Sequence, residues 1–374
     1  MSRQLNRRFR LRRRPDGAVG EGDLELVEES VPSVGLGQAL IRTLWLSIDP
    51  ANRIWMSPVD YGLPPVAIDG VMRGLGIGQV LESRRQDMHP GDLVSGPTGW
   101  QDYALADDSA NEVPFTVVTS PPSASLPALL APLGNPGITA YLGLHDIGKP
   151  QPGETLVVSA AAGAVGSIAG QIGKARGARV VGIAGSEPKC RHVVEDLGFD
   201  ACINYKDAGW RERFDAATPD GVDVDFENVG GRVMDHVLSR LNVGARVALC
   251  GLMSEYNAAT PHIDASRILI RRALMQSFLV LDHSDRYQEA IDYLSGLMAD
   301  GKLKHRETVI EGLEHARDAL NQMFEGANIG KLLVKVAERS DHGLPAPGSC
   351  GRDPAVDRPG GRSVALRNDR HEGT

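Results

Sequence analysis

The chain has 374 residues, enough for two domains of ordinary size, each with its own hydrophobic core. Apolar residues make up 42 % and charged residues 24 %, which is typical of a globular protein, and the formal net charge is −8. This acidic balance argues against a general role in nucleic-acid binding, and the longest apolar runs are too short to span a membrane.

The N-terminal segment is rich in arginine, with seven arginines among residues 3–14. Phe9 and Leu11 alternate with them, which predicts an edge strand that turns its apolar side chains toward the core. A targeting or membrane-surface role for the arginines is the less favoured alternative. Because no apolar signal-peptide core follows, we expect a cytoplasmic protein that binds neither membranes nor nucleic acids.

Two further segments of the first third predict strands. Residues 38–49 have the pattern of a strand, and Pro50 ends it. Gly74, Gly76 and Gly78 form a GxGxG pattern, which can mark a phosphate-binding loop. Because no clear helix follows this pattern, a tightly turned strand of a barrel is the favoured interpretation.

The middle of the chain alternates buried strands with helices, which predicts a parallel sheet wound on both faces, the Rossmann arrangement. Strands are expected at 155–160, 178–185, 200–205, 222–230, 245–251 and 275–281. Helices are expected at 165–176 and 189–198, near 210, from about 232, and at 285–300.

The expected fold class is therefore α/β, with a doubly wound Rossmann sheet joined to a β-rich barrel domain. A last strand at 330–337 is expected to return to the first domain. We predict a β-rich substrate domain at 1–134, completed by 311–337, and a Rossmann domain at 135–310. Glycine, proline and charged residues dominate 338–374, which predicts a disordered tail.

The best-defined motif lies in residues 159–177. Ala161, Gly163 and Gly166 occupy the three positions of the dinucleotide-binding pattern G-x-G-x-x-G. Gly163 lets the backbone approach a pyrophosphate, Gly166 lets the helix pack on the strand, and the helix N-terminus attracts the anion. Since the motif follows a strand and opens a helix, a cofactor site is favoured over a purely structural turn.

The end of the next strand indicates which dinucleotide is bound. NAD sites usually carry an acidic residue there for the ribose 2′-hydroxyl, whereas this chain has Gly185 and Ser186. Lys189 lies just beyond and can pair with a 2′-phosphate, so NADPH is the expected cofactor. Two alternatives stay open: Glu187 as the ribose acid of an NAD site, and Lys189 as a solvated residue in a first helical turn.

The four cysteines, Cys190, Cys202, Cys250 and Cys350, are scattered and form no CxxC pair. Their spacing supports neither a disulfide framework nor a structural zinc site. We expect reduced, mostly buried thiols and no bound metal.

Several motifs, in order along the chain, resemble one family. They include AAAGAVGS (160–167), DVDFENVGG (223–231) and CGLMSEYN (250–257), together with LSIDPANR (46–53), VMRGLGIGQVLESR (71–84) and GANIGKLLVKV (326–336). This set resembles the medium-chain dehydrogenase/reductase superfamily, and within it the zinc-free branch of leukotriene dehydrogenase, oxoprostaglandin reductase, plant alkenal reductase and bacterial curcumin reductase. The Gly-His-Glu motif and four-cysteine lobe of the superfamily's zinc alcohol dehydrogenases are absent from the sequence.

The resemblance implies a GroES-like β-rich domain and the NADPH-dependent reduction of the C=C bond of α,β-unsaturated aldehydes or ketones, with hydride added to the β-carbon. Tyr256 would stabilise the resulting enolate; a loop aromatic packed over the cofactor is the alternative. The implied cofactor-binding residues, from the pyrophosphate and 2′-phosphate to the ribose and nicotinamide, are Gly163, Ala164, Val165, Gly166, Lys189, Tyr205, Asn228, Cys250, Gly251, Phe278, Leu279, Val280 and Asn328.

Some of these residues have simpler explanations, since Phe278 and Val280 suit a sheet core and Asn328 suits a turn. Many relatives have a tyrosine where this chain has Ala51, which predicts a wider or differently lined substrate pocket. The resemblance also implies a homodimer, for which residues 271–280 offer an unpaired strand edge. An NADPH:quinone reductase of the same superfamily and a non-catalytic NADPH-binding protein are the alternative functions.

Overall fold

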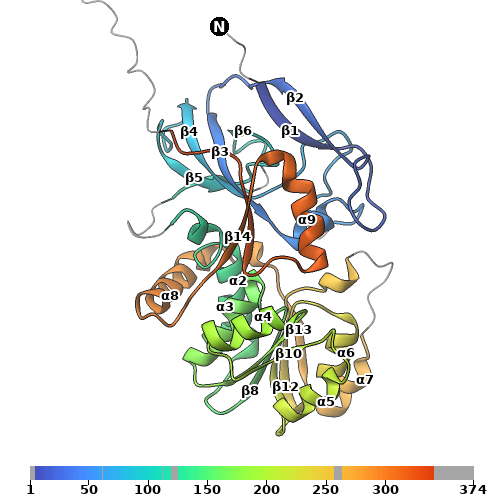
Figure 1. Ribbon diagram of the computed structural model, residues 1–374. Coiled ribbons are helices and arrows are strands. Elements are labelled where there is room, and N and C mark those ends of the chain that lie inside the picture. Colours follow the sequence, from blue (N-terminus) through green and yellow to red (C-terminus); the bar gives the residue numbers. More distant parts are fainter. Residues whose placement is uncertain (1–4, 61, 112, 119–124, 257–262, 341–374) are drawn as a thin grey trace, which may run out of the picture. The chain divides into compact units, whose positions relative to one another are not determined.

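The continuous apolar runs in the middle of the chain form a six-stranded parallel sheet with the order β10-β9-β8-β11-β12-β13 (Figure 1). This is the doubly wound order, whose two halves meet between β8 and β11, and it confirms the Rossmann prediction. The strands are β8 (Thr155–Ser159), β9 (Arg179–Ala184), β10 (Ala201–Asn204), β11 (Val222–Glu227), β12 (Leu241–Leu249) and β13 (Leu274–Ser277).

Helices pack against both faces of this sheet, because alternate residues of its buried strands point to opposite sides. Leu156 and Val158 share a core with α2, α3 and α8, whereas Val157 shares one with α5 and α6. The helices are α2 (Asn135–Leu142), α3 (Ala164–Ala175), α4 (Glu187–Arg191), α5 (Trp210–Ala217), α6 (Gly231–Ser239), α7 (Ala265–Arg271) and α8 (Tyr287–Ala299). The helix expected at 189–198 divides into α4 and a π-helical segment that ends before Gly198, whose φ is +74°.

A second sheet, of seven strands, contains most of the β-rich part (Figure 1). Its path is β14-β15-β3-β4-β5-β7, and β6 pairs with β3. The strands are β3 (Ala39–Ile48), β4 (Gly76–Ser83), β5 (Leu93–Gly96), β6 (Tyr103–Ala106), β7 (Thr116–Val117), β14 (Glu307–Glu311) and β15 (Lys331–Lys335). Antiparallel pairing of β15 with β3 confirms that the last strand returns to the first domain, while the expected boundaries at 134/135 and 310/311 stay predictions.

The GxGxG pattern belongs to this second sheet. Gly76 and Gly78 lie in β4, and a Cβ at Gly78 would come within 2.3 Å of the Ile41 side chain on β3. The glycines therefore permit close strand packing, as expected, and do not form a phosphate loop.

The arginine-rich segment forms β1 (Leu5–Leu11), which pairs with β2 (Leu24–Ser30) in a separate two-stranded sheet. Phe9 and Leu11 are buried as predicted, and ion pairs with acidic side chains hold Arg7 and Arg12. Two more helices, α1 (Pro50–Trp55) and α9 (Ala316–Glu325), complete the β-rich part.

The computed structural model describes residues 5–60, 62–111, 113–118, 125–256 and 263–340. Met1–Arg339 forms one unit and Ser340–Thr374 another, so nearly all of the expected tail lies outside the described residues. No helix among the described residues is long and apolar enough to cross a bilayer.

Candidate active site

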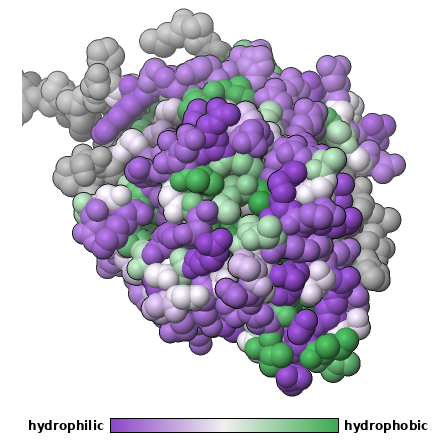
Figure 2. All heavy atoms as spheres, turned by 60° about the horizontal axis from the view of Figure 1, so that its bottom comes forward, coloured by the Kyte–Doolittle hydropathy of each residue, from purple (hydrophilic) through white to green (hydrophobic). Residues whose placement is uncertain are grey.

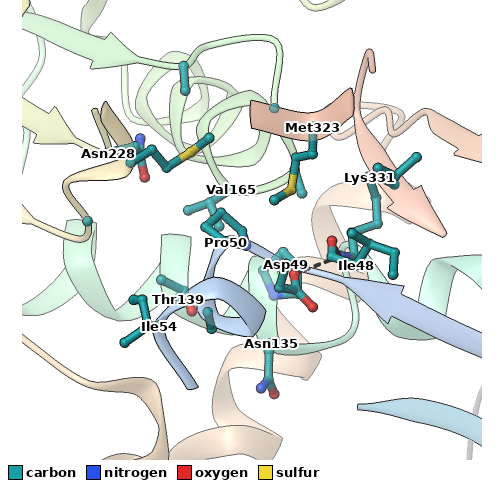
Figure 3. Close-up of a pocket in the computed structure, with 18 of the residues that line it drawn as sticks. Ile48, Asp49, Pro50, Ile54, Asn135, Thr139, Val165, Asn228, Met323 and Lys331 are labelled. Atoms are coloured by element: carbon teal, nitrogen blue, oxygen red, sulfur yellow. Dashed lines mark hydrogen bonds and ion pairs between the residues drawn. The ribbon is translucent and has the colours of Figure 1, made fainter. Parts of the chain in front are cut away.

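A cavity of about 700 Å³ lies at the carboxyl ends of β8, β9 and β11, between the Rossmann sheet and the β-rich part. Val165 and Asn228 line it from the Rossmann side, whereas Asp49, Pro50 and Ile54 line it from the β-rich side (Figure 3). In doubly wound sheets this edge is where ligands bind. The cavity wall includes every site residue expected from the sequence, namely Gly163, Ala164, Val165, Gly166, Lys189, Tyr205, Asn228, Cys250, Gly251, Tyr256, Phe278, Leu279, Val280 and Asn328.

The glycine turn between β8 and α3 has the form of an anion cradle. Gly163 is the N-cap of α3, and no side chain of the described residues caps this helix end. A Cβ at Gly166 would lie 2.4 Å from the Ala160 carbonyl oxygen, so only glycine fits there. Ala160 itself has a left-handed φ of +49°, which the tight turn imposes. The first N–H groups of α3 therefore remain available for a pyrophosphate.

Two lysines converge at the carboxyl end of β9. Lys189 lies in α4, and burial lowers its pKa, with a further lowering by the neighbouring charge of Lys206. A Cβ at Gly185 would lie 3.3 Å from Tyr205 Cε1 and 3.4 Å from Lys206 Cε, so these side chains close over the strand end. Such a concentration of positive charge suits a phosphate.

Glu187, the alternative ribose acid, is exposed and is not part of the cavity wall. Lys206 lines the cavity but was not singled out in the sequence. Its only sequence signal is its place two residues beyond β10, the strand next to β9. Arg232 also approaches this corner, with its guanidinium 5.5 Å from the centre of the Tyr205 ring.

Glu227, at the end of β11, organises the loop that carries Asn228. One of its carboxyl oxygens accepts hydrogen bonds from the Ser159 hydroxyl at 2.9 Å and from the Gly230 N–H at 2.8 Å. The Asn228 N–H donates to Ser159 Oγ at 2.7 Å, and its side-chain amide donates to the Ser159 carbonyl at 2.7 Å. These bonds hold the ends of β8 and β11 together at the cavity, so Asn228 has a fixed position.

A second carboxyl group, that of Asp225, lies on the same strand and is fully buried. Neither of its oxygens has a hydrogen-bond partner among the described residues. Burial raises the pKa of Asp225 well above its ordinary value, and the nearby Glu227 raises it further. Burial also raises the pKa of Glu227. The sequence DVDFE gives no sign of this, because alternating acids also suit a solvated strand face.

The loop after β12 carries Cys250, Gly251 and Tyr256. Burial raises the pKa of the Cys250 thiol to about 12, so the thiol stays protonated. The Leu252 N–H donates to the Tyr256 hydroxyl oxygen at 3.1 Å, which ties the phenol to the turn that lines the cavity. A donor role of Tyr256 toward a substrate stays a prediction.

Residues 278–280 line the cavity just beyond the end of β13 at Ser277, where a strand was expected to continue, and Phe278 and Val280 also pack against the core. A Cβ at Gly143 would lie 2.8 Å from Phe278 Cζ, so the phenyl ring fills space beside α2. The Asn328 amide donates to the Gly330 carbonyl at 2.9 Å, which is the contact of a turn-forming residue. Phe278 therefore packs in the core and Asn328 stabilises a turn, and both residues also line the cavity.

The β-rich side of the cavity is mainly apolar. Ala51, Ile54 and Trp55 of α1 line it, and the Arg73 guanidinium lies 5.5 Å from the centre of the Trp55 ring. Ala51 contributes only a methyl group to this wall, and the wider or differently lined substrate pocket expected from it stays a prediction.

Like Lys206, a second lysine in the cavity wall was not singled out in the sequence. Lys331, at the start of β15, is 2 % exposed, and its ammonium donates to the Ile48 carbonyl and to Asp49 Oδ1, both at 2.7 Å (Figure 3). A lone lysine opening an apolar strand gives no sign of its partner.

The described cysteines, Cys190, Cys202 and Cys250, are free thiols, and Cys350 lies outside the described residues. Within the described ranges no group of three or more histidine, cysteine or acidic side chains is placed to hold a metal ion.

Comparison with known proteins gives matches along most of the chain. The family model described as the N-terminal domain of oxidoreductase matches residues 7–113, and the model described as zinc-binding dehydrogenase matches residues 164–296. The chain is 42 % identical to the NADPH-dependent curcumin reductase of Escherichia coli K12, over 90 % of this chain and 98 % of that protein.

It is also 36 % identical to the 2-alkenal reductase (NADP(+)-dependent) of Nicotiana tabacum, over 89 % of this chain and 98 % of that protein. Among solved structures, that of CurA from Vibrio vulnificus in complex with NADPH matches with a TM-score of 0.83 and 42 % identity. This match covers 89 % of the present chain and 99 % of CurA.

Proposed function

Because this chain belongs to the zinc-free alkenal and enone reductase branch of the medium-chain dehydrogenase/reductase superfamily, we propose that it is an NADPH-dependent reductase of the C=C bond of α,β-unsaturated aldehydes or ketones. The observation that carries this proposal is that one cavity combines two surfaces. Its Rossmann side has the anion cradle and the pair Lys189 and Lys206, and its β-rich side is mainly apolar.

The residues present fit NADPH. The uncapped N-terminus of α3 would bind the pyrophosphate, and Lys189 with Tyr205 and Lys206 would bind the 2′-phosphate. Asn228, fixed by Ser159, would contact the ribose. The segments that would enclose the nicotinamide are Cys250–Gly251 and Phe278–Val280.

Bound NADPH would supply a hydride from its nicotinamide C4 to the β-carbon of the substrate. The residues of the chain must then stabilise negative charge that develops on the substrate carbonyl oxygen. Tyr256 would donate its hydroxyl hydrogen to that oxygen, and solvent or Tyr256 would supply the proton to the α-carbon. The apolar wall around Ala51 and Ile54 would reduce the access of water to the reacting carbons, and a lower local dielectric would strengthen the Tyr256 interaction.

The proposal is tested by measuring turnover of a panel of alkenals, enones and quinones with NADPH and with NADH. We expect enones and alkenals to be reduced with NADPH at much higher kcat/KM than with NADH. Faster turnover of quinones than of every enone would favour a quinone reductase. NADPH binding without turnover of any acceptor would favour a non-catalytic binding protein.

We further propose that the protein is a homodimer that pairs through β13. This strand ends the order of the parallel sheet, and nearby apolar side chains are exposed, with Leu269 78 %, Ile270 67 % and Leu274 48 % exposed. Figure 2 shows hydrophobic side chains gathered in patches on one face of an otherwise hydrophilic surface. Light scattering should give about twice the chain mass of 40.0 kDa, and a monomeric mass at micromolar concentration would exclude this pairing.

A further inference from the structure

Lys331 makes two strong contacts with the start of α1, although a buried ammonium is costly unless it is well paired. Its Nζ donates to the Ile48 carbonyl and to Asp49 Oδ1, each at 2.7 Å. Ile48 is the last residue of β3, and Asp49 is the N-cap of α1. The ammonium therefore binds the junction at which the β-rich sheet passes into the cavity wall (Figure 3).

The cavity surface formed by α1, which we call the α1 wall and which includes Ala51, Ile54 and Trp55, depends on this junction. α1 has six residues, too few for a helix that is stable by itself. The Asp49 N–H donates to Asn52 Oδ1 at 2.8 Å, and the Asn52 side chain donates to the Arg73 carbonyl at 3.1 Å. The same helix presents Ala51 and Ile54 to the cavity. Displacement of Asp49 would therefore move the surface against which a substrate lies.

The backbone next to Lys331 contacts the opposite wall. The Gly330 N–H donates to the Ala162 carbonyl at 2.7 Å, and Gly330 forms a parallel β-bridge with Gly163 of the anion cradle. The Lys331 N–H donates to the Arg306 carbonyl at 2.9 Å, which fixes the strand itself. The backbone of Gly330 thus contacts the glycine turn on the Rossmann side of the cavity. The side chain of the next residue, Lys331, contacts the start of α1 on the β-rich side.

We propose that Lys331 is a positioning residue, whose ammonium holds the α1 wall at a fixed distance from the glycine turn. This inference rests on the proposed reductase function. Reacting atoms must approach to roughly 3–3.5 Å, and an error of about 1 Å costs on the order of a hundredfold in rate. Lys331 therefore controls the rate of reduction and leaves cofactor affinity almost unchanged, because its side chain points to α1 and not to the cradle.

The main test compares Lys331→Met with Lys335→Met. Methionine keeps most of the side-chain volume and removes the ammonium. Lys335 lies on the same strand but pairs with Glu311 and Glu338, away from the cavity. For Lys331→Met we expect kcat with an enone to fall about tenfold to a hundredfold, while NADPH Kd from fluorescence titration changes less than about threefold. Lys335→Met should keep the parent values.

Two readouts separate positioning from general loss of structure. With NADPH deuterated at both C4 positions, Lys331→Met should show a larger isotope effect on kcat than the parent, because the misplaced chemical step becomes rate-limiting. Amide hydrogen exchange in residues 49–56 should accelerate without any enone present. If Lys331→Met does not fold, Asp49→Ala should reproduce the loss and Asp49→Asn, which keeps an acceptor oxygen, should restore most of the rate.

Parental kcat and isotope effect in Lys331→Met would overturn the inference, and so would equal losses of turnover and NADPH affinity. A parent protein that binds NADPH but reduces no enone would instead contradict the proposed function. In that case hydrogen exchange in residues 49–56 still tests the link between Lys331 and α1.

Discussion

Replacement of Lys189 by alanine tests the assignment of the 2′-phosphate site. Its ammonium is half-buried at the end of β9, and no carboxylate of the described residues lies within ion-pairing distance of it. A charge-assisted hydrogen bond contributes about 1.5–3 kcal/mol, which corresponds to roughly a tenfold to a hundredfold change in Kd. We therefore expect Lys189→Ala to weaken NADPH binding by that factor and to leave NADH binding unchanged.

The assay is a fluorescence titration of both cofactors with matched variants. Lys206 is exposed, so its contribution should be screened, and Lys206→Ala should weaken NADPH by less than about fivefold. Lys174, which pairs with Asp200 at 2.8 Å outside the cavity wall, provides the control that changes charge alone.

The titration also predicts a pH dependence. Burial, together with the charge of Lys206, lowers the pKa of Lys189, so NADPH affinity should decline at a lower alkaline pH than an ordinary lysine would give. Equal losses for NADPH and NADH in Lys189→Ala would refute the reasoning. Selective loss of NADH binding in Glu187→Ala would point to an NAD site instead.

Three other substitutions test separate parts of the structure. Tyr256→Phe removes a donor and keeps the ring, so kcat with enones should fall about tenfold to a hundredfold at constant NADPH Kd; an unchanged kcat would leave the phenol with a packing role. Ala51→Tyr should raise KM for bulky aromatic enones at least about tenfold and for small alkenals much less, because the phenol ring would occupy space in the cavity next to α1. Equal effects on both substrate classes would show that residue 51 does not limit substrate size. Asp225→Asn should stabilise the protein. Burial raises the pKa of Asp225 in the folded state above its unfolded value of about 3.9. Below that pH the group is protonated in both states and does not reduce the free energy of unfolding. As pH rises from there toward the folded-state pKa, the free energy of unfolding falls. Calorimetry should therefore show a melting-temperature gain that grows from pH 5 to pH 8, and a gain independent of pH would contradict a protonated Asp225.

Much of the fold and part of the candidate site follow from local sequence patterns. The buried runs that become β8 and β9 are continuous and apolar because both faces of a parallel sheet are covered, so their positions are visible without any tertiary information. The glycine turn is equally local, since Gly163 and Gly166 meet steric limits set by Ala160, only a few residues away. The return of β15 to β3 is less local, because it pairs the apolar run at 330–337 with a strand of the first domain.

Contacts between residues far apart in the chain were decided by the tertiary structure alone. Lys331 and Asp49 are separated by 282 positions, and Ser159 and Glu227 by 68, so no spacing rule connects either pair. The sequence predicted that Phe278 and Asn328 belong to the site, but only packing showed that the phenyl ring also fills the space beside Gly143 and that the amide closes its own turn. A single sequence encodes periodicity and local steric limits directly, whereas the pairing of buried charges depends on which distant elements the folded core brings together.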